Sequence, residues 1–147
     1  MIAFDEITAF RLVRRLAVGE GTFAMYLLVC PDEVRALIED DLKAEAEVQL
    51  GSPIQITDIA ELLLDPEPNF PFSERAVCCF HIRHLSAGVI SLLDTHVVRL
   101  ERRGNQLLFL ATPETTNQLL IEAPNFRNRL TEVMRIVPDP SIGSGAA

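Results

Sequence analysis

The chain has 147 residues, of which 48% are hydrophobic and 23% are charged, and its formal net charge is −8 at pH 7. This composition excludes a disordered main body, and the length fits one domain that buries roughly two-thirds of its unfolded surface. The negative charge argues against general binding to nucleic acids or anionic membranes. The three cysteines lie in apolar runs, which indicates buried, reduced thiols. No apolar run reaches the ~20 residues of a membrane span, so we expect a cytoplasmic protein.

The predicted elements of the first third are a helix, a strand and a second helix. Apolar residues recur every three positions over 5–18 and predict the first helix. The nearly continuous apolar run 23–30 predicts a strand that is buried on both faces of a parallel sheet. Pro31 suits the first position of the second helix, which is predicted to extend to about residue 48.

The remainder of the chain continues the alternation. Strands are predicted at 54–59, 76–82, 106–111 and 132–137, and helices near 62–64, from 86 to about 103 and from 113 to about 123. The proline-rich segment 65–71 fits neither a helix nor a central strand. We therefore predict an α/β fold, a three-layer sandwich around a mainly parallel five-stranded sheet, with 1–137 as a single domain and 138–147 as a disordered tail or linker.

The junction after the strand at 23–30 is the place where an open α/β fold would carry a phosphate-binding loop. Such a loop needs free backbone N–H groups, a glycine and usually a lysine. The sequence here is Cys30-Pro-Asp-Glu33, in which the proline has no N–H and the two carboxylates repel phosphate. We expect no nucleotide turnover, which leaves weak adenine stacking as an open alternative.

Four segments in the second half carry a resemblance to a known class of domain. They are Leu92-Leu-Asp-Thr-His-Val-Val-Arg99, Asn105-Gln-Leu-Leu-Phe-Leu110, Leu119-Leu-Ile-Glu-Ala-Pro-Asn-Phe126 and Arg135-Ile136. Over roughly 10–137 the chain resembles a bacterial α/β domain found near the N-terminus of large signalling and defence proteins. That domain is similar to the core of the STAND and AAA+ P-loop ATPases with the nucleotide loop eroded. The resemblance implies a sensor, adaptor or assembly domain without a Walker A motif.

The densest cluster of reactive side chains is Cys78-Cys-Phe-His-Ile-Arg-His84. Cys79, His81 and His84 are residue types that bind zinc, but their spacing fits no zinc motif, so we predict no metal and no cofactor. A cysteine protease would need a thiol after the strand that follows the histidine, and residues 110–113 contain none. We therefore predict that the protein is not an enzyme.

The carboxyl edge of the predicted sheet is the alternative place for function, because open α/β folds bind ligands there. The polar candidates at this edge are Asp32, His81, His84 and Thr112. A small-ligand or nucleotide sensor, or a weak enzyme, would use them. A deep polar pocket with a shifted histidine pKa would favour this alternative, whereas a flat, self-complementary apolar patch would favour assembly.

The candidates for a protein interface are aromatic and basic: Phe70, Phe72, Arg99, Arg102, Arg103, Arg127 and Arg129. Aromatic side chains between prolines suit a partner groove, and arginines suit bidentate contacts with carboxylates or phosphates. We expect a non-catalytic interaction or assembly domain of a bacterial signalling or defence system. Its expected partners are another protein, further domains of a larger chain or a second copy, with no nucleic acid and no membrane.

Overall fold

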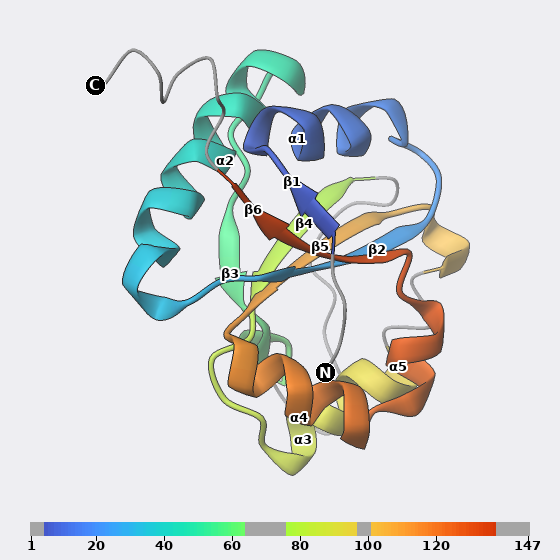
Figure 1. Cartoon of the computed structure of the whole chain (residues 1–147). Coiled ribbons are helices and arrows are strands. Elements are labelled where there is room, and N and C mark those ends of the chain that lie inside the picture. The colour runs from blue at the N-terminus through green and yellow to red at the C-terminus, as the bar shows by residue number, and fades with distance from the viewer. Residues whose placement is uncertain (1–4, 64–75, 97–100, 138–147) are drawn as a thin grey trace.

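The fold is an α/β arrangement around one parallel sheet (Figure 1). The computed structural model describes residues 5–63, 76–96 and 101–137. Within these residues the sheet has six strands in the order β1-β6-β2-β5-β4-β3, and all neighbouring pairs are parallel. The predicted α/β class is confirmed, whereas the predicted number of five strands is one too low.

The two central strands are the ones with the longest apolar runs. The strands are β1 (Asp5–Ile7), β2 (Ala24–Val29), β3 (Ile56–Asp58), β4 (Val77–His81), β5 (Gln106–Ala111) and β6 (Glu132–Ile136). Every residue of β2 and β5 is buried. Continuous burial is expected for parallel strands that are covered on both faces, so the apolar pattern correctly predicted these two strands.

The additional strand β1 lies where the sequence predicted the start of the first helix. Asp5 pairs with Met134 of β6. The helix α1 (Ala9–Val18) begins only after Thr8, whose hydroxyl accepts a hydrogen bond from the Arg11 amide at 3.2 Å. Because Ile7 is buried in the strand and also fits the helical spacing, the periodicity extended the predicted helix too far.

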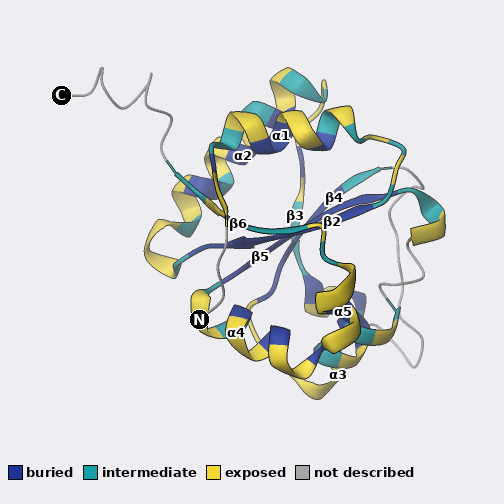
Figure 2. Ribbon diagram, turned by 45° about the vertical axis from the view of Figure 1, so that its right-hand side comes forward, coloured by how far each residue is buried: buried dark blue, intermediate teal, exposed yellow. Residues whose placement is uncertain are grey.

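Helices cover both faces of the sheet. On one face lie α1 and α2 (Arg35–Gln49), and on the other lie α3 (Ala87–Ser91), α4 (Pro113–Glu122) and α5 (Pro124–Arg129) (Figure 1). The described residues also contain short helical segments. These include the 3-10 helices η1 (Asp32–Val34) and η2 (Ile59–Leu62) and the π-helix η3 (Leu92–His96). The buried sides of the helices face the sheet, and their outer sides are exposed (Figure 2). None of these helices is long and apolar enough to span a membrane.

The long helix predicted from 86 to about 103 is not continuous. Ser86 caps α3 as predicted, but the α-helix ends at Ser91. The next five residues form the π-helix η3. Within η3 the Asp94 carboxylate accepts hydrogen bonds from the backbone amides of Asn125 (2.8 Å) and Phe126 (3.3 Å). This contact with the start of α5 is tertiary, so helical periodicity alone could not indicate it.

Each face of the sheet has its own apolar core. On the side of α3, α4 and α5, the Phe109 ring stacks on Phe80 with a centroid distance of 5.7 Å and lies 5.3 Å from Phe126. On the side of α1 and α2, Leu28 and Leu108 belong to the second core. The two cores hold the sheet between the two helical layers. Polar side chains lie at the carboxyl edge of the sheet, where the strands end.

Candidate functional site

The chain leaves the carboxyl ends of the neighbouring strands β2 and β5 in opposite directions. After β2 it passes through α2 on one face towards β3, and after β5 it passes through α4 and α5 on the other face towards β6 (Figure 1). Adjacent parallel strands that diverge in this way form a crevice at the carboxyl edge, where open α/β proteins bind ligands. Cys30 follows β2 at this edge and Thr112 follows β5.

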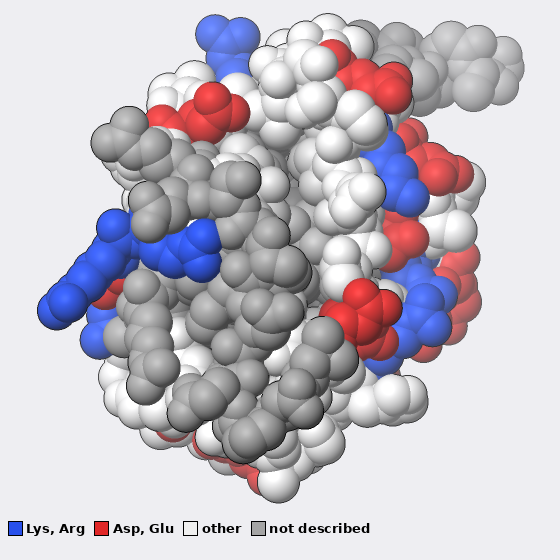
Figure 3. All heavy atoms as spheres, turned by 180° about the vertical axis from the view of Figure 1, so that it is seen from behind, with Lys and Arg blue, Asp and Glu red and all other residues white. Residues whose placement is uncertain are grey.

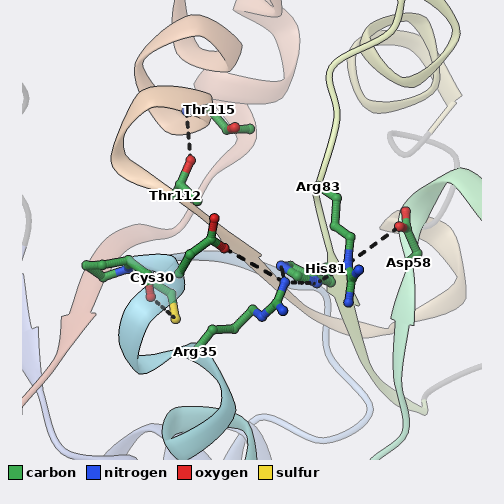
Figure 4. Close-up of polar contacts among 9 residues, drawn as sticks. Cys30, Arg35, Asp58, His81, Arg83, Thr112 and Thr115 are labelled. Atoms are coloured by element: carbon green, nitrogen blue, oxygen red, sulfur yellow. Dashed lines mark hydrogen bonds and ion pairs between the residues drawn. The ribbon is translucent and has the colours of Figure 1, made fainter.

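Three side chains from different elements meet beside this edge (Figure 4). His81 is the last residue of β4, Arg35 is the first residue of α2, and Arg83 follows β4 by two positions. Arg35 Nη1 lies 3.1 Å from His81 Nε2 and 3.4 Å from Nδ1. Arg83 Nε lies 3.2 Å from Nδ1. We refer to these residues as the Arg35–His81–Arg83 cluster.

The environment of His81 favours its neutral form. The residue is only 5% exposed. Burial, together with the positive charges of Arg35 and Arg83, lowers the pKa of His81 below its ordinary value of 6.5, and Glu39 and Asp58 only partly oppose this shift. The imidazole is therefore neutral at pH 7. In the neutral ring, one nitrogen carries a hydrogen and the other nitrogen accepts a hydrogen bond.

The nearest carboxylates form only long ion pairs with the two arginines. Asp32 Oδ1 is 3.8 Å from Arg35 Nη1, and Asp58 Oδ2 is 4.0 Å from Arg83 Nε. Both separations exceed hydrogen-bond distance. The other oxygen of Asp58 accepts from the Ala60 amide at 2.9 Å and so caps η2. These carboxylates moderate the positive charge of the cluster without forming direct hydrogen bonds to the guanidinium groups at those atoms.

A polar pocket of about 430 Å³ opens beside the cluster at the carboxyl ends of β3 and β4. It is lined by Glu39, Ile56, Thr57, Asp58, Glu61, His81 and Arg83. The lining thus combines hydrogen-bond donors with carboxylates. Acidic and basic side chains also lie interspersed along the right-hand margin of the face in Figure 3. A site with such mixed charge suits a small polar molecule better than an extended polyanion.

The predicted ligand-site residues have different positions in the structure. Asp32 and His81 both lie close to Nη1 of Arg35. Thr112 is at the same edge, but its hydroxyl accepts from the Thr115 amide at 3.2 Å and caps α4 (Figure 4). His84 is exposed in the segment between β4 and α3.

Sequence reasoning missed Arg35 and Arg83. One signal was available, because Arg35 places a cation in the first turn of a helix, where the helix dipole favours an anion. A positive charge at the positive end of the helix dipole indicates that the arginine side chain makes another, favourable interaction. Arg83 could have been found from its position two residues after the histidine at the strand end.

The structure describes four of the predicted interface residues, which are Arg102, Arg103, Arg127 and Arg129. Phe70, Phe72 and Arg99 lie outside the part of the chain that the structure describes. Arg102 and Arg103 lie in a turn before β5, at the opposite edge of the sheet from the cluster. Arg129 Nη1 donates to Glu101 at 2.8 Å, whereas Arg127 lines a separate groove of about 590 Å³ with Leu120, Ile121 and Leu130.

The zinc ligand set considered from the sequence is not assembled. Cys79 is buried in the core beneath α1 and α2, and His84 is exposed. Among the residues that the structure describes, no three His, Cys, Asp or Glu side chains are grouped as metal ligands would be.

Fold and site together define an α/β domain with a six-stranded parallel sheet and a polar cluster at its carboxyl edge. No protein-family model matches the chain, and no curated protein matches it. Function therefore has to be inferred from the chemistry of the site itself.

The lowered pKa of His81 predicts a pH dependence of stability. Below pH 6.5 the unfolded chain binds a proton at this position that the folded protein does not, so stability is lost as the pH falls from neutral into the range below 6.5. The contribution of one proton is at most about 1.4 kcal/mol per pH unit. Urea unfolding across this range should show a shallower loss for H81Q than for the wild type.

The exposed neighbour His84 provides the matched control for this measurement. H84Q removes a histidine without touching the buried cluster, so it controls for the loss of a histidine side chain at the same end of β4. Equal slopes for H81Q and the wild type would show that burial and the two arginines do not lower the pKa of His81 on folding.

Proposed function

We propose that the domain is a non-catalytic sensor or binding module that takes a small polar ligand at the carboxyl edge of β3 and β4. The observation that carries this proposal is the Arg35–His81–Arg83 cluster beside a polar pocket of about 430 Å³. Perturbed histidines in polar pockets are more frequent at functional sites than elsewhere. The position beside the crevice between β2 and β5 also supports ligand binding.

Binding rather than catalysis is supported by the nucleophiles at this edge. Cys30 is the thiol nearest to the crevice, and burial together with Glu39 raises its pKa to about 11. A thiol with this pKa carries almost no thiolate at neutral pH and makes a poor nucleophile. The Thr112 hydroxyl caps α4, and no general base approaches it among the described hydrogen bonds.

A second candidate function is assembly through a second copy, a role that the resemblance to signalling and defence domains also implies. One observation favours it. Leu37 is 67% exposed and Val34 is 39% exposed, and both border a mainly apolar groove of about 270 Å³ with Ala9, Ile136 and Val137. Side chains of this type on a helix surface suit burial against another chain. The likeness to an eroded P-loop ATPase core stays part of this proposal, supported by the parallel sheet and the Cys30-Pro-Asp-Glu33 junction.

The proposed function is tested by a thermal-shift screen of anionic, neutral and cationic metabolites, with the oligomeric state followed by light scattering. A ligand at one hundred times its dissociation constant adds about 2.7 kcal/mol of stability, which such a screen resolves. We expect at least one small polar compound to stabilise the protein and to shift the His81 ring resonances in NMR spectra. Stabilisation by none of the three classes, with self-association at Leu37, would contradict ligand binding and favour assembly.

A further inference from the structure

The Arg35–His81–Arg83 cluster contains more hydrogen-bond donors than acceptors. A guanidinium group donates five hydrogen bonds and accepts none, and a neutral imidazole offers one acceptor nitrogen. Arg35 Nη1 is close to both ring nitrogens, at 3.1 Å from Nε2 and 3.4 Å from Nδ1, and Arg83 Nε lies 3.2 Å from Nδ1. If Nδ1 is the acceptor, both arginines compete for it. If Nε2 is the acceptor, it can serve Arg35, and the hydrogen on Nδ1 is placed against the Arg83 donor.

This excess of donors lies in a partly dehydrated place. His81 is 5% exposed and the Arg35 side chain is 26% exposed, whereas the Arg83 side chain is 53% exposed. The carboxylates that could relieve the excess lie 3.8 Å and 4.0 Å from the nearest arginine nitrogens. The cluster therefore favours an additional acceptor group placed against both arginines and the ring.

We propose that Arg35 and Arg83 bind one carboxylate or phosphate group of a small ligand against His81. This inference rests on the proposed function, because it names the chemical class of the ligand for the pocket beside the cluster. His81 and Arg83 line that pocket, and Arg35 contacts His81 from α2. An oxyanion supplies several lone pairs at once, and arginine binds carboxylates and phosphates through parallel hydrogen bonds. The position of Arg35 in the first turn of the 15-residue helix α2 adds the positive end of the helix dipole.

The surrounding carboxylates restrict the size of the anion. Glu39 of α2, Asp58 of β3 and Glu61 of η2 line the pocket, and Asp32 of η1 faces Arg35. These four charges repel polyanions such as nucleoside triphosphates. They also oppose a single anionic group, so the hydrogen bonds from the two arginines have to outweigh this repulsion. They suit a ligand whose remaining part is neutral or carries hydrogen-bond donors.

Binding of the anion should be linked to proton uptake. The anion offsets the positive charges of Arg35 and Arg83, which lower the pKa of His81, so this pKa rises in the complex. The protonated ring then donates to the anion from one nitrogen. Affinity should increase as the pH falls from 8 to 5.5, by up to about tenfold per pH unit while one proton is taken up.

The test is an NMR titration of the whole chain with succinamate, a monocarboxylate that does not itself titrate above pH 5.5. Succinamide is the matched neutral probe, and inorganic phosphate separates a phosphate site from a carboxylate site. We expect succinamate or phosphate to shift the His81 resonances saturably and succinamide to have no effect. R35Q and R83Q should weaken binding at least tenfold, and R11Q, at an exposed position on α1, should not.

Each other outcome has a defined meaning. If neutral or cationic compounds from the screen shift His81 and both anions fail, the oxyanion inference is overturned and the proposed function remains. If no compound shifts His81, both fail. Should R35Q not fold, R35K keeps the charge but loses the planar fork, and it should bind more weakly than the wild type with the same pH trend. An affinity that does not change with pH would contradict the proposed uptake of a proton by His81 on binding.

Discussion

Replacing Phe109 by alanine is expected to lower the free energy of unfolding by about 3–5 kcal/mol. The side chain is fully buried in the central strand β5. Its ring lies between those of Phe80 and Phe126, so it connects two strands of the sheet with the helical layer of α5. Alanine removes the apolar ring and leaves a cavity that a sheet fixed on both faces cannot close.

This loss is large compared with the roughly 5–15 kcal/mol by which domains are stable. For a chain of this length it corresponds to a fall in the melting temperature of roughly 6–20 °C. Thermal and urea unfolding of F109A measure it. F10A is the matched control, because Phe10 is 44% exposed on α1 and the same substitution should cost much less there.

A third variant keeps this prediction testable if F109A does not fold. F109L retains most of the apolar volume and should lose less stability than F109A. Equal stabilities of F109A and F10A would mean that Phe109 is not part of a packed core, and the arrangement of β5 against α5 would then be wrong.

The second large expected effect is a low reactivity of the three cysteines in the folded protein. Burial raises the pKa of Cys30 from 9.0 to about 11 and that of Cys78 to about 12. Burial also raises the pKa of Cys79. Because the thiolate is the reactive form, a rise of two pKa units alone slows reaction at neutral pH about a hundredfold, and restricted access slows it further.

A thiol reagent that releases a coloured product measures this effect with and without concentrated urea. We expect slow reaction of the native protein and rapid reaction of all three thiols after unfolding. The C30S variant identifies the contribution of the cysteine nearest to the crevice. A Cys30 that reacts in the native protein as fast as in the unfolded chain would contradict its burial and would make thiol chemistry at this edge a candidate function.

The candidate site could be predicted only in part from the sequence. The rule that ligands bind at the carboxyl edge directed attention to His81 and to the junction after residue 30, and both lie at that edge in the structure. It could not indicate Arg35, which lies 46 positions away from His81 in the chain. Thr112 was correctly placed as a cap, and that capping hydrogen bond occupies the hydroxyl that was considered for ligand binding.

The sequence by itself determined the class of fold and the central strands. Continuous apolar runs such as β2 and β5 can be stable only where both faces are covered, and local caps such as Ser86 and Thr112 fix helix starts through hydrogen bonds to residues three positions away. The tertiary structure alone decided the order of the strands, the addition of β1 and the meeting of Arg35, His81 and Arg83. The physical reason is that strand order depends on the packing of whole layers, whereas propensities and caps act over a few residues.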